Sequence, residues 1–453
     1  MTRSMTKGSP WKLILAFSLP LLLGNLFQQF YNMADAAIVG RTLGANALAA
    51  VGSTSSIQFL VLGFCSGVTQ GFAIPVAQRF GAGDEDGMRQ YVFGSYVLTA
   101  ICAAITTTAT VLLCPTILHL LQVHPDIYHD AYAYLVIIFA GIPFTLLYNM
   151  LSAVMRAIGD SRTPFLFLAF SACLNIILDL VCIRIFHMGC AGAAIATITA
   201  QAISGILCML YMHRKIHIVK IQKQDQIITP ESCKTLLIMG LPMGLQFSIT
   251  AIGSMVMQAG NNSLGTVYVS GFTSGMRIKQ LMMCPFDAIG AGVSTFLAQN
   301  YGNNAYDRIK QGYRSGLIMA IGYGMLAALV MTTLGRTMSM LFVSIDAVDV
   351  LNASALYLFR IGIFYPVLGI LIITRMAIQG LGYSGKAMIG GIVEMFARTI
   401  VTLGLVGILQ YDAITWADQT AWTSAVIYLI PTYLHCLKEV KMRIQQDLAY
   451  RNS

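Results

Sequence analysis

The stretch LPLLLGNLFQQFYNMADAAIVGRTLG, from Leu19 to Gly44, decides the class of this protein. It belongs to an expected helix over 13–37 that is long and apolar enough to span a membrane. This helix nevertheless contains five amide and acid side chains: Asn25, Gln28, Gln29, Asn32 and Asp35. At about 1.5 Å of rise per residue, Asp35 lies roughly 33 Å from Leu13, near the far side of the hydrocarbon layer. An acid there is costly unless it faces a partner or water, so a functional role and a simple helix-end role both stay open.

Composition excludes the soluble globular class. Hydrophobic residues make up 57% of the 453 residues, charged residues make up 10%, and the mean hydropathy is +0.71. Apolar stretches of span length recur along the whole chain and predict an all-α integral membrane protein with twelve transmembrane helices. We expect these helices over 13–37, 47–78, 91–113, 131–155, 163–186, 190–213, 234–258, 267–299, 315–335, 354–376, 387–408 and 416–436.

Basic residues are concentrated on one side of these spans. On one side, 21 lysines and arginines occupy the N-terminal segment, every second loop and the C-terminal tail, whereas the opposite loops hold 3, namely Arg41, Arg184 and Arg336. Cytoplasmic loops carry such an excess of positive charge, so we expect both termini in the cytoplasm. The net charge of +9 reflects this bias. We expect no nucleic-acid partner, because no basic stripe alternates with stacking aromatic residues.

The two halves of the chain repeat each other at an offset of about 222 residues. Leu19-Pro20 recurs as Leu241-Pro242, AQRFGAG (77–83) as AQNYGNN (298–304), and GDS (159–161) as GYS (382–384). Six spans separate each pair, so the copies cross the membrane in the same direction, as in some secondary transporters. The repeat predicts two pseudo-symmetric six-helix lobes, the ion-coupling lobe over 1–212 and a second over 234–437. A cytoplasmic linker (213–233) joins them, and a basic cytoplasmic tail (438–453) follows.

Small residues and prolines recur within the predicted spans. Gly63, Gly67 and Gly71 follow each other at four-residue spacing, which lets helix backbones approach closely. Prolines inside spans predict kinks; they stand at positions 20, 75, 143, 242, 285 and 366.

The repeats differ in their acids. Asn175 and Asp179 lie one turn apart on the expected helix over 163–186, and their approximate counterparts are Arg398 and Thr402. Asp35 corresponds to Met257, so the second half lacks both acids. Asp35 and Asp179 lie at similar depth in the membrane, which favours a shared site. Such a pair could hold a proton or, with nearby amide and hydroxyl oxygens, a hard cation such as Na⁺, and the sequence leaves this choice open.

Other charges within the spans carry alternatives. Glu394 and Arg398 lie one turn apart and form either a self-neutralising pair or a second coupling site. Asp287 either pairs with Arg277 or Lys279 or lines a cavity.

Several segments together resemble one family. GNLFQQFYNMADAAIVGRTLGANALAAVG (24–52), RAIGDSRTP (156–164), LNIILD (174–179) and AQNYGN (298–303) are similar to the multidrug and toxic compound extrusion (MATE) family. The resemblance covers essentially the whole chain and is strongest to the DinF-like branch with its MepA-type bacterial multidrug pumps.

This resemblance implies two lobes around a central cleft and alternating access. It also implies export of small-molecule organic cations or amphiphiles in exchange for H⁺ or Na⁺, by a protein of the bacterial inner membrane that needs no cofactor and no metal besides Na⁺. We expect a monomer whose partners are these cations and the lipid bilayer. Carried over to this chain, the coupling site comprises Asp35, Asn149, Asn175, Asp179 and Thr197. Our candidates for the substrate cleft are Gln28, Tyr31, Asn32, Met257 and Asp287.

Two alternative functions would require other sequence features. A flippase for a lipid-linked saccharide would favour a basic cleft, but the basic residues within the spans are Arg277, Lys279, Arg360 and Arg398 alone. A membrane enzyme would need a nucleophile–base or metal motif such as H-E-x-x-H or G-x-S-x-G, and the sequence contains none.

Overall fold

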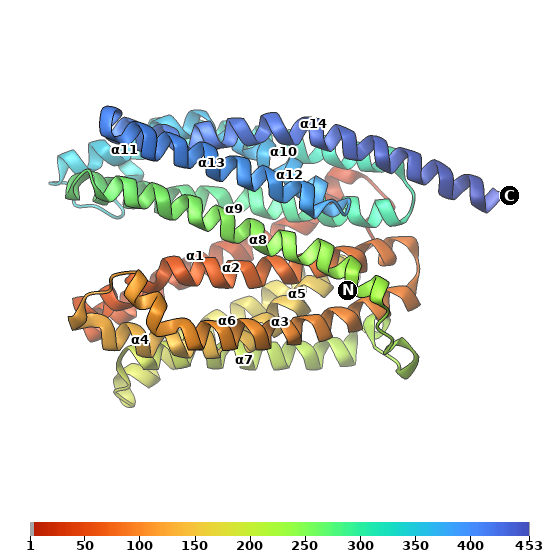
Figure 1. Cartoon of the computed structure of the whole chain (residues 1–453), viewed down its shortest axis with the longest axis horizontal. Coiled ribbons are helices and arrows are strands. Elements are labelled where there is room, and N and C mark those ends of the chain that lie inside the picture. Colours follow the sequence, from red (N-terminus) through yellow and green to blue (C-terminus); the bar gives the residue numbers. More distant parts are fainter. Residues whose placement is uncertain (1–3, 453) are drawn as a thin grey trace. The chain divides into compact units, whose positions relative to one another are not determined.

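The computed structural model describes residues 4–452, apart from the side chains of residue 45 and of residues 447–452. Arg3 and the side chain of Arg451, both used for the expected orientation, therefore lie outside the described part. The regular elements of this part are all helical (Figure 1), which confirms the all-α prediction.

The α-helices are α1 (Pro10–Leu43), α2 (Ala45–Ala82), α3 (Glu85–Leu120), α4 (Pro125–Ala140), α5 (Ile142–Ala157), α6 (Arg162–Leu180), α7 (Gly189–Lys215), α8 (Pro230–Asn262), α9 (Thr266–Gly302), α10 (Tyr306–Ser339), α11 (Val348–Ile363), α12 (Tyr365–Gly380), α13 (Ser384–Leu409) and α14 (Tyr411–Asn452). Short π or 3₁₀ turns are η1 (Val181–Ile185), η2 (His217–Val219) and η3 (Lys223–Asp225).

Two of the predicted spans are broken helices. Within residues 4–452, 9 helices are individually long and apolar enough to cross a membrane, and the pairs α4+α5 and α11+α12 raise this number to 11. The axes bend by 45° and 55° within these pairs. Pro143 and Pro366 stand in the first turn after each break, where a missing backbone N–H is tolerated. The kinks predicted at these two prolines are confirmed.

Helix α14 accounts for the twelfth predicted span. It does not reach the hydropathy of the other spans because its membrane part carries polar residues such as Asp418 and Gln419. Both side chains are almost completely buried, at 0% and 1% exposure. The polar groups therefore face the protein, and the mean hydropathy of α14 understates how apolar its outer surface is.

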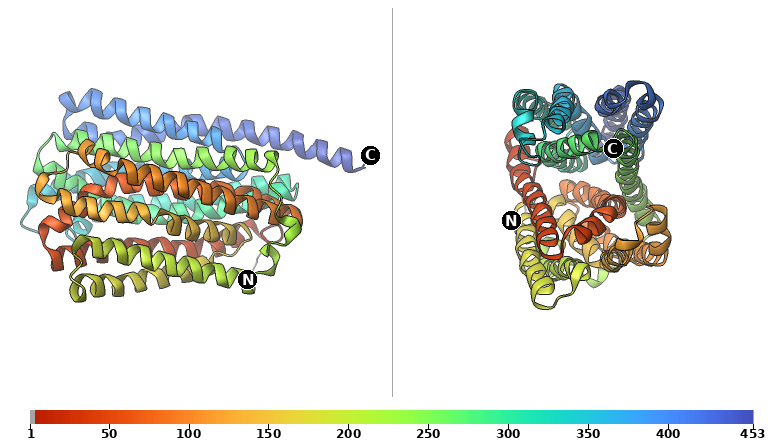
Figure 2. Two further views of the ribbon diagram at one scale, coloured as in Figure 1. Left: turned by 60° about the horizontal axis from the view of Figure 1, so that its bottom comes forward. Right: turned by 90° about the vertical axis from the view of Figure 1, so that its left-hand side faces the viewer.

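The chain forms two compact units, each built of helices that run alongside one another (Figure 2). Among the described residues, we call residues 4 and 23–244 unit 1, and residues 5–22 and 245–452 unit 2. These units differ from the predicted lobes: the first part of α1 belongs to unit 2, and the first part of α8 belongs to unit 1. The two changes of unit fall two residues after Pro20 and Pro242, which are equivalent positions of the repeat.

Glycines bring α8 against α2 within unit 1. A Cβ atom on Gly67 would lie 2.6 Å from the carbonyl oxygen of Met243, and one on Gly71 would lie 2.5 Å from that of Met239. Such distances are shorter than van der Waals contact, so only glycine fits at these two positions of α2. Two of the three glycines noted in the sequence thus mark a helix crossing.

The N-terminal segment is held within unit 2. The backbone N–H of Met5 donates to the side-chain oxygen of Gln299 at 2.8 Å. Arg308 donates to the carbonyl oxygens of Met5 and Gly8 at 3.0 and 2.9 Å. Met5 is buried at 2% exposure. The repeated AQNYGN stretch and the start of α10 therefore position the segment that leads into α1.

The predicted linker between the repeats is held in a comparable way within unit 1. Arg89 on α3 donates to the buried carboxylate of Asp225 at 3.0 Å, and the backbone N–H of Gln222 donates to the same oxygen at 2.8 Å. Turns η2 and η3 pack against α3. The segment that leads into α8 is therefore an ordered part of unit 1.

Candidate functional site

Three helices of unit 1 supply the residues that the sequence indicated. Helix α6 carries Asn175 and Asp179 one turn apart, both buried, and continues directly into the π-helical turn η1. Such wide turns often occur at functional sites. Helix α1 carries Tyr31 and Asp35 one turn apart, and α7 carries Thr197.

The carboxyl groups of Asp35 and Asp179 lie within hydrogen-bonding reach of each other. Ionised carboxylates only accept hydrogen bonds, so a hydrogen bond between the two forms when one of them carries a proton. Each acid also has one buried oxygen, Oδ1, without a partner among the described residues. Neither acid pairs with a lysine or arginine in residues 4–452. The pair is therefore a negatively charged pocket with free coordination positions.

The amide of Asn175 lies between Thr197 and Asp179. In the orientation that satisfies both groups, its nitrogen donates to Asp179 at 2.9 Å and its oxygen accepts from the Thr197 hydroxyl at 3.1 Å. The hydroxyl oxygens of Tyr31 and Thr197 are 3.5 Å apart. Tyr31, which we expected in the substrate cleft, thus lies beside the acid pair.

Two further residues of this pocket escaped the sequence analysis. Tyr134 on α4 is buried and close enough to interact electrostatically with both Asp35 and Asp179. Gln58 on α2 lies beside the Tyr134 side chain and donates to the hydroxyl of Thr54 at 2.8 Å. An available signal was the repeat itself, since a tyrosine recurs 223 residues later, as Tyr357.

Asn149 lies apart from the other four expected coupling residues. It is half-buried on α5 and forms no hydrogen bond to them within the described part of the chain. Nearby on α5, Leu147 and the backbone of Tyr148 contact the position of Gly205 on α7. Gly205 is eight residues along α7 from Thr197, which corresponds to about 12 Å. The structure thus brings together Asp35, Asn175, Asp179 and Thr197.

The expected cleft residues have different environments. Gln28 donates to Asn32 at 3.2 Å on an exposed part of α1, and Asp287 is exposed on α9. Met257 is instead packed in the hydrophobic core of unit 2 at 1% exposure. Its proposed place in a cleft is wrong, because its long flexible side chain fills space between helices.

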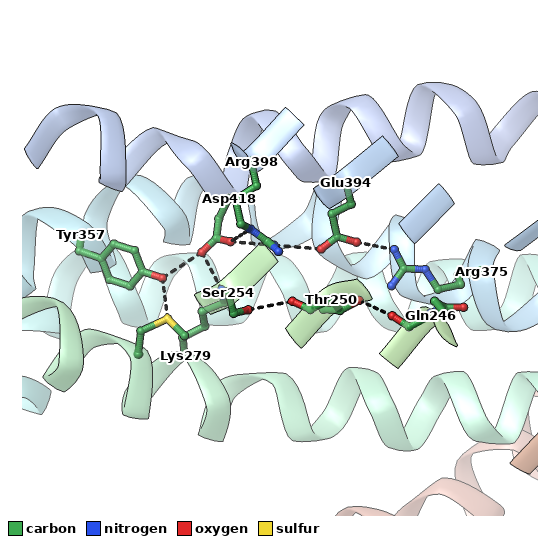
Figure 3. A network of polar contacts seen from close by, with 10 residues as sticks. Gln246, Thr250, Ser254, Lys279, Tyr357, Arg375, Glu394, Arg398 and Asp418 are labelled. Carbon is green, nitrogen blue, oxygen red and sulfur yellow. Dashed lines mark hydrogen bonds and ion pairs between the residues drawn. The ribbon is translucent and has the colours of Figure 1, made fainter. Parts of the chain in front are cut away.

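Glu394 and Arg398 belong to a larger ionic network in the interior of unit 2 (Figure 3). Glu394 pairs with Arg398 at 3.0 Å and also with Arg375 on α12. Arg398 further pairs with Asp418 on α14 at 2.9 Å. Lys279 on α9 pairs with the other oxygen of Asp418 at 2.6 Å. The pair identified in the sequence is therefore neutralised by several partners.

Neither of the two basic residues suggested as partners of Asp287 forms an ion pair with it in the described part of the chain. Lys279, one of its two suggested partners, pairs with Asp418, and Arg277 lies over the ring of Phe342, 5.8 Å from its centre. Asp287 instead interacts electrostatically with Arg375 and remains exposed.

Comparison with known proteins gives the same family for both repeats. The family model MatE matches residues 20–181 and again residues 242–403. The probable multidrug resistance protein YpnP of Bacillus subtilis is 31% identical over 378 residues, which cover 83% of this chain and 84% of that protein. The probable multidrug resistance protein NorM of Thermotoga maritima is 24% identical over 419 residues, which cover 90% of this chain and 89% of that protein.

Solved structures show the same fold. An outward-facing multidrug resistance MATE family transporter of the MOP superfamily matches with a TM-score of 0.90 at 21% identity, covering 96% of this chain and 98% of the other. A MATE structure in complex with MaL6 matches with a TM-score of 0.89 at 22% identity, covering 97% and 98%. The chain belongs to the MatE family of multidrug and toxic compound extrusion transporters.

Proposed function

We propose that this protein is a secondary active multidrug efflux transporter that exports cationic or amphiphilic organic compounds in exchange for H⁺ or Na⁺. The observation that carries this proposal is the pair of neighbouring carboxyl groups of Asp35 and Asp179, each of which has a buried oxygen that accepts no hydrogen bond from the described residues. Buried acids of this kind mark ion pathways in membrane proteins.

The pocket suits either coupling ion. A proton shared by the two carboxyl groups removes their mutual repulsion. When that proton leaves, a sodium ion could take its place, because carboxylate, amide and hydroxyl oxygens are the ligands that hard cations prefer. The amide oxygen of Asn175 and the hydroxyl oxygen of Thr197 lie in the same pocket, and Asn175 presents its nitrogen to Asp179. Emptying the pocket leaves two like charges in contact, which favours a different arrangement of α1 and α6 and so couples the ion to alternating access.

For substrate binding we propose polar groups within the spans of each unit. Gln28 and Asn32 lie on an exposed part of α1, and the exposed carboxylate of Asp287 on α9 could attract an organic cation. We place the protein as a monomer in the bacterial inner membrane with both termini in the cytoplasm, in line with the distribution of basic residues.

Transport by purified protein in liposomes tests this function. Efflux of the cationic dye ethidium is measured under a Na⁺ gradient and, separately, under a pH gradient. We expect one of the two gradients to drive transport by the wild type, and we expect Asp35→Asn and Asp179→Asn to lower the rate at least tenfold. Asp346→Asn, which changes an exposed acid between α10 and α11, is the matched control. Wild-type rates in the Asp179→Asn protein would overturn the proposal.

A further inference from the structure

Corresponding positions of the two repeats carry different chemistry. The pocket of unit 1 contains Gln58 on α2, Asn175 on α6 and Thr197 on α7, all uncharged. The residues 221 to 223 positions later, on α9, α13 and α14, are charged: Lys279, Arg398 and Asp418. The tyrosine is kept, as Tyr134 on α4 and Tyr357 on α11. Each unit therefore contains a version of the same pocket, with its charges on different helices.

The acids of the two pockets also differ in position. Asp35 and Asp179 correspond to Met257 and Thr402, both buried and uncharged in unit 2. Asp418 supplies the acid of this second pocket from α14 instead. Tyr357 donates to Asp418 at 3.0 Å, so the shared tyrosine again lies beside an acid.

The acids of the two pockets are satisfied to different degrees. Asp35 and Asp179 each leave one buried oxygen without a partner. Asp418 is fully buried but has donors on both oxygens, Lys279 at 2.6 Å on one and Arg398 at 2.9 Å on the other. The cations that neutralise this acid are thus part of the protein.

Lys279 is the cation dedicated to Asp418. Arg398 shares its charge with Glu394, at 3.0 Å, whereas Asp418 is the single ion-pair partner of Lys279 in the described residues. The Lys279 ammonium is buried at 7% exposure and lies 5.3 Å from the centre of the Trp422 ring, a favourable position for a desolvated cation. An ammonium is a compact point charge, so among side chains it most resembles a small monovalent ion.

We propose that Lys279 is a tethered cation that takes, in unit 2, the place that the coupling ion takes beside the acids of unit 1. This inference rests on the proposed ion-coupled function of unit 1. Because Lys279 cannot leave, the acid of unit 2 stays neutralised in every state, and ion exchange is confined to unit 1. When the ammonium is removed, Arg375 and Arg398 still balance Glu394 and Asp418, but the Asp418 oxygen that Lys279 contacted keeps only the Tyr357 hydroxyl as a donor. The vacated position beside this oxygen then becomes one that a small external cation can occupy.

The test uses a protein whose first pocket has been neutralised. In an Asp35→Asn/Asp179→Asn background, melting temperatures of the full chain in detergent are compared in sodium chloride and choline chloride of equal ionic strength, and at acidic and alkaline pH. Lys279→Met is then added to this background. We expect sodium or protons to raise the melting temperature of this triple variant by about 3 °C or more over the response of the background.

Adding Asp418→Asn to the triple variant is the matched control. It removes the acid that needs the cation, so the added ion response should disappear. A Lys279→Met protein whose melting temperature responds to sodium and pH no more than the background does would overturn the proposal. If Lys279→Met yields no folded protein, Lys279→Gln gives the same readout, because its amide keeps a hydrogen-bond donor for Asp418 without a charge.

This experiment separates the two proposals. The function proposed for unit 1 fails if the wild type and the Asp35→Asn/Asp179→Asn protein respond alike to sodium and to pH. That comparison does not involve Lys279. The tethered-cation proposal is decided within the background alone, by the difference that Lys279→Met makes.

Discussion

The carboxyl groups of Asp35 and Asp179 lie within hydrogen-bonding reach of each other, although α1 and α6 are separated in the chain by four other helices. The pocket around them is completed by the amide of Asn175, which links Asp179 to Thr197. The properties of this pocket depend on which donors reach the two acids.

Replacing Asn175 by leucine should shift the ion dependence of efflux. The substitution keeps the size of the side chain but removes the donor to Asp179 at 2.9 Å. This donor favours the ionised carboxylate, and a hydrogen bond to a charged group contributes about 1.5–3 kcal/mol, so without it a proton should bind more tightly and the half-saturating proton concentration for efflux should fall roughly tenfold or more. Cys173→Ala, at an exposed position of the same helix, is the control. An unchanged half-saturating concentration would show that Asn175 has no part in ion binding.

Replacing Tyr134 by phenylalanine should alter coupling while the protein still folds. The change removes the hydroxyl that lies near both acids and beside Gln58, but keeps the buried ring. A neutral hydrogen bond contributes about 0.5–1.5 kcal/mol, so we expect a severalfold change in the ion dependence of efflux. Tyr132→Phe, two residues away in the stack with Tyr128, should have no such effect. Equal ion dependence of the two variants would speak against a role for Tyr134.

Adding a methyl group at Gly67 should destabilise unit 1. The new Cβ atom would lie 2.6 Å from the carbonyl oxygen of Met243, and backbone must move to relieve this clash. Overpacking of this kind costs about 1–3 kcal/mol, so the melting temperature of Gly67→Ala should fall by several degrees. Gly52→Ala, where the Cβ atom meets open space on the same helix, should leave it unchanged or slightly raised. Equal melting temperatures would mean that α2 and α8 are less closely packed than described.

Replacing Arg308 by methionine should release the N-terminal segment from unit 2. Arg308 donates to the carbonyl oxygens of Met5 and Gly8, and Met5 in turn donates to Gln299. Without these donors, hydrogen exchange at the Met5 amide should become roughly tenfold faster or more. Arg314→Met, at an exposed position on the same helix, is the control. Protection of Met5 that persists in Arg308→Met would show that other contacts hold the segment.

Much of the fold follows from the sequence because a bilayer admits few solutions. A backbone without water must satisfy its own hydrogen bonds, so each apolar stretch of span length becomes a helix. Pro143 and Pro366 break two of these helices as expected. The changes of unit after Pro20 and Pro242 were not predicted, because hydropathy marks where a helix lies in the membrane and not which neighbours it packs against.

The candidate site was predictable where residues share a helix or match a family motif. Asn175 and Asp179 lie one turn apart on α6, so their common face is a matter of helical period. Tyr134 and Gln58 were missed because aromatic and amide residues are common in membrane helices and neither carries a charge. Met257 was wrongly assigned to a cleft because a pattern of methionines does not tell a cavity wall from a packed core.

The sequence by itself determined the helical spans, the repeat and the presence of two membrane acids in the first half alone, because these depend on local hydrophobicity and helical period. The tertiary structure decided which helices meet: that Asp35 reaches Asp179, that Asn149 lies apart, and that Lys279 and Arg398 enclose Asp418. Such contacts depend on the rotation and crossing of each helix, which close packing of side chains from distant segments sets.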